Sequence, residues 1–441
     1  MNHLDLLADL VARAKSAGAD EADAVLVAGR QLSIQRRLGQ TEQLERSEAQ
    51  DVGLRVFIGR RQAIVSSTSI DPANFAQLAE RAVAMARIVP EDPYSELLEA
   101  PPPAPGSLDL DEPGEPTPEA LIARAAAAEE AALAVPGITN SEGAEAGWSR
   151  TEIALATSHG FAASYARTRH SLSATALAGA GTGMQRDYDY GVATHQAALD
   201  SPEAIGRSAG ERAIARLNPT RPTTAMLPVI FDPRVSSSLL GHLSSAINGA
   251  SVARGTSFLK DKLGEPIFAP GISIRDDPTR PRGLRTTPFD GEGQPTAPLA
   301  LVEDGRLMTW LLDGRSARQL GLASNARAAR GTGGPPHPSA TNLYLAPGPQ
   351  SPNDLIAGIT LGLYVTELIG MGVNGITGDY SRGAAGFMIR NGALAEPVAE
   401  ITIAGHLLGM FKSLIPANDL VFRRGTDAPT VLVDGMTLAG T

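Results

Sequence analysis

Four consecutive polar residues in a glycine-rich stretch are the first candidates for chemistry in this sequence. Asp379, Tyr380, Ser381 and Arg382 lie within residues 372–392, a segment of 21 residues that contains six glycines. Glycine tolerates positive φ angles and the close approach of another backbone or of a ligand. Such a backbone could hold the four polar side chains at the rim of a cavity. The alternative is a purely structural corner of a β-sheet.

Two carboxylates on one short loop form a second, weaker candidate. Asp290 and Glu292 lie in residues 288–293, where they could bind a cation or act as an acid and base pair. Two carboxylates in a glycine turn more often belong to a solvated loop, so both interpretations stay open.

The histidines are further weak candidates. Seven histidines are spread over the chain and none lies three or four residues from another, so no helical metal-binding pair can form. His242 falls on the apolar stripe of a predicted helix, which favours a hydrogen-bonded core histidine over a functional one. His406 follows a predicted strand at residues 400–405 and could face the glycine-rich stretch.

Composition excludes several classes of protein. The 441 residues include no cysteine, so the chain has neither disulfides nor thiolate metal ligands, and it lacks the common zinc-protease, serine-hydrolase and P-loop motifs. A net charge of −10 disfavours a nucleic-acid partner. The acidic N-terminus is unlike a signal peptide, and the longest apolar region, 359–376, is broken by polar residues and glycines. We therefore expect a cytoplasmic chain with no membrane span.

The first half of the chain, residues 1–218, predicts an α+β domain built from two lobes. Residues 1–89 read as a helix, antiparallel strands and a second helix, and residues 119–218 repeat that order. Between them, residues 90–118 contain nine prolines and little periodicity, which predicts an extended connector.

The second half, residues 219–441, predicts a β-rich domain, either a sandwich or a partly closed barrel. Three dipeptides that lie between apolar runs predict hairpin turns: Asp304-Gly305, Asn391-Gly392 and Asp434-Gly435. Asp71-Pro72, Asp232-Pro233 and Ser351-Pro352 predict capped helix starts.

Five segments together resemble one known family over essentially the whole chain. Residues 241–251, 287–293, 311–322, 376–386 and 400–405 are similar to the PmbA/TldE family, historically called modulators of DNA gyrase. The resemblance implies the same α+β architecture with a β-rich C-terminal half. It also implies one subunit of the TldD/TldE complex, a cytoplasmic metalloprotease that degrades unfolded peptides and matures small peptide precursors.

The resemblance places the catalytic metal in the other subunit. A TldD-type chain carries a helix with two histidines and a glutamate, together with a later cysteine, as its zinc site. The corresponding helix here, residues 233–248, offers only His242, without a glutamate, and the chain has no cysteine. Because a catalytic zinc normally needs three protein ligands and a base for its water, we expect no metal in this chain and zinc in a TldD-type partner.

The leading hypothesis is a catalytically silent subunit that forms a heterodimer with a TldD-type metalloprotease and walls one side of a peptide-binding cavity. Tyr380, Ser381 and Arg382 are candidate contacts to the peptide or the partner, with Asp379 holding the loop through backbone hydrogen bonds. Peptide could add as a strand to an exposed sheet edge.

The first alternative is a stand-alone homodimeric peptidase or hydrolase that uses Asp290, Glu292, His242 or His406. A second, a regulator that binds gyrase or DNA, is suggested only by the historical family name, and the acidic charge opposes it.

Overall fold

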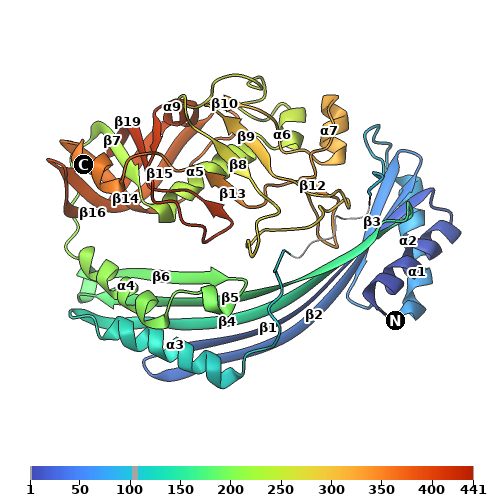
Figure 1. Cartoon of the computed structure of the whole chain (residues 1–441), viewed down its shortest axis with the longest axis horizontal. Helices are drawn as coiled ribbons and strands as arrows, with labels where there is room; N and C mark the ends of the chain where they lie inside the picture. The colour runs from blue at the N-terminus through green and yellow to red at the C-terminus, as the bar shows by residue number, and fades with distance from the viewer. Residues whose placement is uncertain (1, 102–107, 441) are drawn as a thin grey trace.

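The structure, a computed structural model, describes residues 2–101 and 108–440. Figure 1 shows a long curved sheet in the N-terminal half that runs beneath a β-rich C-terminal half. The mixed α+β class expected from the sequence is confirmed.

One antiparallel sheet of six strands, in the order β3-β2-β1-β4-β5-β6, organises the N-terminal half. The two predicted lobes are joined within it, because β1 pairs with β2 on one side and with β4 on the other. The strands are β1 (Glu21–Arg37), β2 (Gln40–Ile58), β3 (Arg61–Ser67), β4 (Ile138–Thr157), β5 (Ala162–Ala178) and β6 (Gln185–Ala193).

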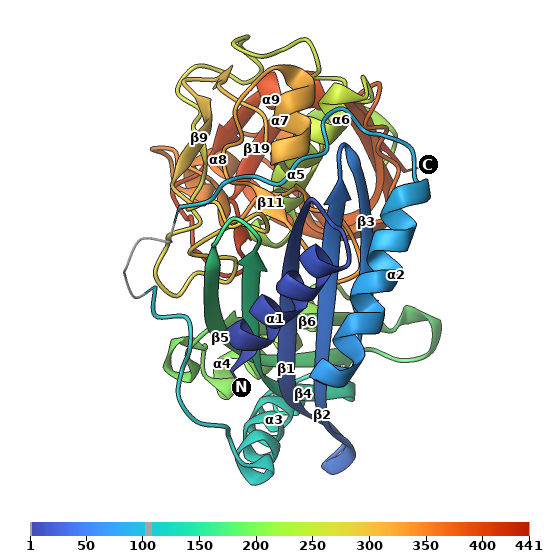
Figure 2. The ribbon, with the colours of Figure 1, turned by 90° about the vertical axis from the view of Figure 1, so that its right-hand side faces the viewer.

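Two helix pairs cover one face of this sheet, one pair toward each end. Figure 2 shows α1 and α2 packed side by side, and α3 and α4 form the second pair. The helices are α1 (His3–Ser16), α2 (Phe75–Ile88), α3 (Pro118–Leu133) and α4 (Pro202–Ala215), with short 3₁₀ turns at Pro72–Asn74, Gly181–Gly183 and Gln196–Ala198.

The period of two in β1 separates the two faces of the sheet. Leu26 packs with α1 and α2 in one apolar cluster, and Leu32 and Ile34 pack with α3 and α4 in another. The odd-numbered residues in this part of β1 therefore point to the opposite face, toward the C-terminal half. Asp23, Val25 and Val27 lie on that face.

The proline-rich connector contains no helix or strand in the residues described, 90–101 and 108–117, while residues 102–107 lie outside the described part. Its first part runs beside α7 (Gly314–Leu320) of the C-terminal half. There the Asp92 carboxylate lies 2.6 Å from Arg315 Nε, and the Tyr94 carbonyl accepts a hydrogen bond of 2.8 Å from Arg318. The connector thus ties the two halves together.

A closed barrel of five strands forms the centre of the C-terminal half, because β16 pairs with β19 as well as with β15. Its strands are β7 (Ala225–Phe231), β14 (Leu361–Ile369), β15 (Asp379–Arg390), β16 (Ala393–His406) and β19 (Val431–Ala439), and β17 (Leu414–Pro416) pairs antiparallel with β19. The barrel predicted from the sequence is closed, not partly open.

Short strands and helices complete this half. A second sheet has the order β10-β9-β8-β13-β18, and β11 pairs with β12. These strands are β8 (Ile274–Asp276), β9 (Leu299–Glu303), β10 (Arg306–Leu307), β11 (Ala328–Ala329), β12 (His337–Pro338), β13 (Leu343–Leu345) and β18 (Thr426–Asp427). The helices are α5 (Pro233–Ala246), α6 (Gly249–Ala253), α7, α8 (Pro352–Ala357) and α9 (Leu407–Lys412).

Most of the predicted turns and caps are confirmed. Asn391-Gly392 closes the β15–β16 hairpin and Asp304-Gly305 closes the β9–β10 hairpin, each pair with positive φ at both residues. The side chains of Asp71, Asp232 and Ser351 accept the backbone N–H bonds expected of N-caps.

The predicted hairpin at Asp434-Gly435 is wrong. The pair lies inside β19, where Val433 is opposite Val229 and Met436 is opposite Leu227, so β19 carries one extra residue. Gly435 has a φ of +75° and absorbs that residue as a β-bulge. The strand therefore continues along β7.

Among the residues that the structure describes, none of the helices combines the length and apolarity required to span a bilayer.

Candidate functional site

Tyr380 and His242 form the centre of the first candidate site. Tyr380 is the second residue of β15, and its side chain is 2% exposed within the barrel core. Its ring meets the His242 ring of α5 edge to face, with 5.8 Å between the ring centroids and an interplanar angle of 81°. We call Tyr380, His242 and Arg382 the His242–Tyr380 cluster.

Two polar atoms of this cluster are buried without a hydrogen-bond partner in the described part of the chain: the Tyr380 hydroxyl and His242 Nε2. The prediction of a hydrogen-bonded core histidine at position 242 is therefore wrong for Nε2. An unsatisfied buried polar group costs about 1–3 kcal/mol, so such atoms mark places where a ligand can bind.

Arg382 supplies the charge of the cluster. Burial lowers the pKa of His242, and the positive charge of Arg382 lowers it further. Burial also raises the pKa of the Tyr380 hydroxyl far above its usual value, although Arg382 opposes that shift. Both rings are neutral at pH 7 and lie near the positive charge of Arg382, an arrangement that suits a carbonyl or carboxylate oxygen of a ligand.

The zinc site of a TldD-type chain does not fit these residues. His242 is the single metal-ligating side chain of its helix, and its neighbours are a phenol and a guanidinium whose charge repels a cation. Within residues 2–101 and 108–440, no three or more His, Cys, Asp or Glu side chains gather as metal ligands would.

Residues 374–379 form a tight exposed turn beside the cluster. The Asn374 side chain accepts hydrogen bonds from the backbone N–H groups of Ile376 and Thr377, at 2.9 and 3.3 Å. The Asp379 carboxylate instead accepts the Thr377 hydroxyl at 2.6 Å. The backbone hydrogen bonds that the sequence analysis assigned to Asp379 thus belong to Asn374, and the signal for them was Asn374-Gly375, since Asn side chains favour such turns.

His406 and Ser381 lie on either side of this turn. His406 Nε2 is 2.8 Å from the Thr377 carbonyl oxygen, so the ring holds the turn in place. A Cβ atom on Gly378 would lie 2.9 Å from the same ring, which explains glycine at that position. Ser381 is exposed, and it contributes to the turn through its backbone N–H, which donates to the Gly372 carbonyl at 2.7 Å.

Asp290 and Glu292 are buried, with exposures of 5% and 2%, so the solvated-loop interpretation is wrong. The Asp290 carboxylate accepts the backbone N–H groups of Glu292 and Gln294, both at 2.9 Å, and of Ala328 at 3.1 Å. Burial raises the pKa of Asp290 to about 6. Burial together with the Asp290 charge raises the pKa of Glu292 to about 7.

A buried ion-pair cluster next to these carboxylates joins the two halves of the molecule. Asp23 of β1 lies between Arg55 of β2 and Arg330 of the C-terminal half, with distances of 3.0 Å from its Oδ2 to Arg55 Nε and 2.6 Å from its Oδ1 to Arg330. Burial alone would raise the pKa of Asp23, but the two guanidiniums outweigh it and hold the pKa below its usual value. The sequence pattern did not predict this cluster, although a charged residue within the apolar run 22–27 was a possible signal.

The histidines and the buried carboxylates do not meet. No hydrogen bond, ion pair or ring contact in the described part of the chain joins His242 or His406 to Asp290 or Glu292. These four residues thus do not assemble a nucleophile, base and orienting acid.

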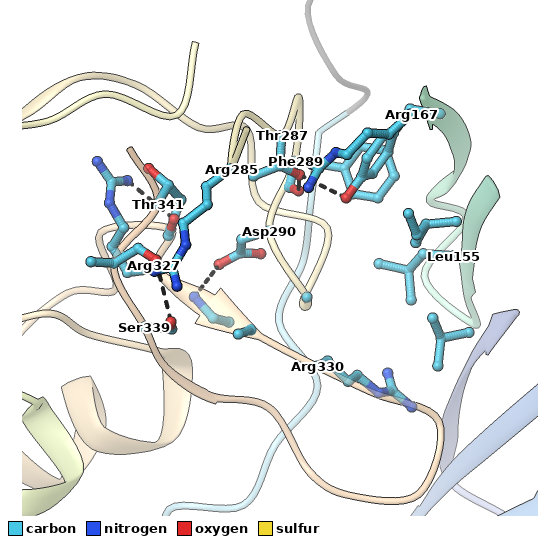
Figure 3. A pocket seen from close by; sticks show the side chains of 18 of the residues that line it. Leu155, Arg167, Arg285, Thr287, Phe289, Asp290, Arg327, Arg330, Ser339 and Thr341 are labelled. Carbon is cyan, nitrogen blue, oxygen red and sulfur yellow. Dashed lines mark hydrogen bonds between the residues drawn. The ribbon is translucent and has the colours of Figure 1, made fainter. Parts of the chain in front are cut away.

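A cavity of about 300 Å³ lies between the two halves of the molecule (Figure 3). One wall is the open face of the N-terminal sheet, and the other is formed by residues 285–291 and 326–341 of the C-terminal half. Asp290 lines it, whereas the His242–Tyr380 cluster does not.

Family models match the chain in three consecutive segments. Residues 22–86 match PmbA/TldA metallopeptidase domain 1, residues 111–217 the central domain of that family, and residues 224–440 its C-terminal domain.

Similar proteins and structures agree with these matches. Metalloprotease PmbA of Escherichia coli O157:H7 is 38% identical over 416 residues, which cover 93% of this chain and 90% of that protein, and a PmbA homolog of Haemophilus influenzae is 33% identical over the same shares. A Bacteroides thetaiotaomicron protein described as a candidate modulator of DNA gyrase superposes with a TM-score of 0.91 at 25% identity, covering 99% of this chain and 98% of that one.

TldE of Thermococcus kodakarensis shares the fold, with a TM-score of 0.87 at 21% identity over 99% of this chain and 100% of that chain. Three domain models in order and a relative that matches over nearly its full length lead to one assignment. This chain belongs to the PmbA/TldD metallopeptidase family.

Proposed function

We propose that this chain is the subunit without metal in a cytoplasmic two-chain metalloprotease that degrades or processes unfolded peptides. A TldD-type partner supplies the zinc, and this chain supplies one wall of the peptide cavity. The observation that carries the proposal is the His242–Tyr380 cluster: on the helix where the family's metal subunit has its ligands, one histidine lies beside a tyrosine and near an arginine.

The cluster suits peptide binding. A peptide carbonyl or carboxylate oxygen could accept hydrogen bonds from the Tyr380 hydroxyl and a His242 N–H, and the Arg382 charge favours that oxygen. These residues orient and hold a peptide, and they move no proton in its cleavage.

An apolar surface next to the cluster supports contact with a partner or a peptide. Ile369, Met371 and Ile376 are 57%, 86% and 62% exposed, all within residues 369–376 that lead into β15. Large apolar side chains gathered on one exposed segment are typical of a binding surface. Ser381 is exposed at the same end of β15.

The alternative of a stand-alone homodimeric hydrolase draws no support from a specific arrangement of residues. It needs a histidine and a carboxylate to act together, and His242 and His406 contact neither Asp290 nor Glu292 within residues 2–101 and 108–440.

Cleavage of an unfolded model peptide by this chain, by a TldD-type partner and by their mixture tests the proposal. We expect the mixture to cleave, this chain alone to be inactive, and a chelator to abolish the activity of the mixture. Robust chelator-insensitive cleavage by this chain alone would instead support the stand-alone hydrolase.

A further inference from the structure

The cavity between the two halves has one apolar wall. The alternation in β1 and β4 turns small aliphatic side chains toward it, and two aromatic rings, Tyr165 and Phe289, extend the wall with 5.3 Å between their centroids. The apolar lining consists of Val25, Val27, Ile153, Leu155, Tyr165 and Phe289.

Four arginines give the rest of the lining a positive charge: Arg167, Arg285, Arg327 and Arg330. Arg327 pairs with the buried Asp276, and Arg330 shares the Asp23 carboxylate with Arg55. The other two have no carboxylate partner in the described part of the chain. Figure 3 shows Arg285 and Arg167 on either side of the loop that carries Thr287 and Phe289.

Arg285 is the arginine best placed to bind a ligand. It is exposed, and its guanidinium makes no hydrogen bond or ion pair within residues 2–101 and 108–440. The terminal nitrogens of Arg167 donate to the carbonyl oxygens of Leu284 and Thr286, and its buried Nε has no hydrogen-bond partner among the described residues. Arg167 thus adds positive charge to the cavity.

The acidic groups nearby do not cancel this charge. Asp23 faces two guanidiniums, those of Arg55 and Arg330. The Asp290 carboxylate, the one acidic group in the lining, is occupied by three backbone N–H groups. An anion that entered the cavity would therefore meet an excess of positive charge.

Hydroxyl groups in the lining distinguish a peptide from a simple fatty acid. The hydroxyls of Ser339 and Thr341 donate to protein oxygens, which leaves their own lone pairs free to accept the N–H groups of a ligand. The Thr287 hydroxyl donates to the Phe289 carbonyl and lies 3.2 Å from the Tyr165 hydroxyl. A bare hydrocarbon chain would bury these acceptors unpaired, at a cost in affinity. A peptide end carries apolar side chains, N–H groups and a carboxylate together.

We propose that this cavity binds the carboxyl-terminal end of an apolar peptide, with the terminal carboxylate on Arg285 and an aliphatic side chain against Val25, Val27 and Leu155. The inference takes its peptide ligand from the function proposed above and adds a site for the free end, separate from the His242–Tyr380 cluster. A volume of about 300 Å³ is at the small end of the range for ligand pockets and suits one or two residues.

Calorimetric titration of the purified full-length chain, without any partner, tests the site. The probes are N-acetyl-leucyl-leucine, its C-terminal amide and octanoate. We expect the free acid to bind and the amide to bind about tenfold more weakly, because the amide loses the charge-assisted hydrogen bonds to Arg285. Octanoate should bind more weakly than the free acid.

Three variants locate the binding. Arg285→Gln should weaken the binding of the free acid about tenfold and remove the difference in affinity between acid and amide. The matched control is Arg207→Gln on α4, an exposed arginine outside the cavity, which should change nothing. Val27→Phe should weaken the binding of acid and amide alike, because the larger ring fills the space beside the apolar wall.

Equal affinities for acid and amide, tighter binding of octanoate, no binding at millimolar concentration, or equal effects of the Arg285 and Arg207 variants would each overturn the proposal. Because no partner and no cleavage are involved, the titration can fail while the mixture of two subunits still cleaves peptide. It can also succeed while that mixture is inactive.

Discussion

Tyr380 carries a hydroxyl that is buried without a partner, so its replacement by phenylalanine separates a role in stability from a role in binding. Removing an unsatisfied hydroxyl should not lower the free energy of unfolding and should raise it by about 1 kcal/mol. The same change should reduce peptide cleavage by the two-subunit mixture about tenfold, because the hydroxyl would contact the peptide. Urea unfolding and the cleavage assay measure the two effects.

The opposite result would give Tyr380 a structural role. If Tyr380→Phe lowers the stability and leaves cleavage unchanged, its hydroxyl has a partner within the fold and no part in binding.

Arg382 and Arg390 form a matched pair at the two ends of β15. Arg382 lies beside the His242–Tyr380 cluster, whereas Arg390 makes an exposed ion pair with Glu396. Arg382→Ala should leave unfolding unchanged and reduce cleavage by the mixture about tenfold, whereas Arg390→Ala should change neither, because an exposed ion pair contributes little. Unchanged cleavage with Arg382→Ala would remove this residue from the site.

The raised pKa of Glu292 should make the stability of the protein depend on pH. Its pKa is about 7 in the folded protein against an ordinary value of 4.5. Between these values the folded protein keeps a proton that the unfolded chain releases, so this group makes the free energy of unfolding fall as the pH rises from 4.5 to 7. The fall amounts to roughly 3 kcal/mol, and above pH 7 the contribution is constant.

Urea unfolding of the wild type and of Glu292→Gln between pH 4.5 and 8 measures this contribution as a difference. The wild type should lose stability relative to the variant as the pH rises to 7. Parallel curves would show that Glu292 has the same pKa in the folded and unfolded chain.

Among the elements, β2 and the loop 331–334 pack closely against each other across the boundary between the two halves. A Cβ atom on Gly53 of β2 would lie 2.1 Å from the Thr332 carbonyl oxygen. Gly53→Ala must push the loop away and should lower the free energy of unfolding by about 1–3 kcal/mol. Urea unfolding measures the loss, and limited proteolysis should cut the loop 331–334 faster.

Gly334→Ala is the control in the same loop, because a Cβ atom there meets nothing within 4 Å and its φ is not left-handed. Equal stability of the two variants would show that the contact at Gly53 is dispensable.

The helix caps and hairpin turns could largely be predicted from the sequence, because each depends on a few neighbouring residues. The caps at Asp71, Asp232 and Ser351 and the hairpin at Asn391-Gly392 depend on short-range hydrogen bonds and φ angles. Asp434-Gly435 has the same local signal, but pairing with β7 on both sides of it decides that the strand continues. That pairing is non-local and does not appear in the sequence pattern.

The candidate site was only partly predictable for the same reason. The cluster of polar residues at 379–382 was visible, but the contact of Tyr380 with His242 joins residues 138 positions apart. The burial of Asp290 and Glu292 arises from α7 and from the docking of β1 and β2, which no pattern within residues 288–293 contains.

At the scale of the whole molecule, the curved N-terminal sheet and the C-terminal barrel act as one framework. Asp23 pairs across their boundary with Arg330, and the connector binds α7 through Arg315 and Arg318. Truncating either partner of a buried ion pair leaves an uncompensated charge, so the two halves depend on each other. This framework holds the cavity of Figure 3 and the His242–Tyr380 cluster at fixed places on one chain.

Reconstitution with metal-free chain tests whether this chain completes a metalloprotease without metal chemistry of its own. This chain is treated with a chelator, dialysed and titrated into a metal-loaded TldD-type partner, and cleavage of an unfolded peptide is measured at each ratio. We expect cleavage to rise to a plateau near an equimolar ratio and to equal the value for untreated chain. Cleavage by this chain alone, or a requirement to return metal to this chain before the mixture works, would contradict it.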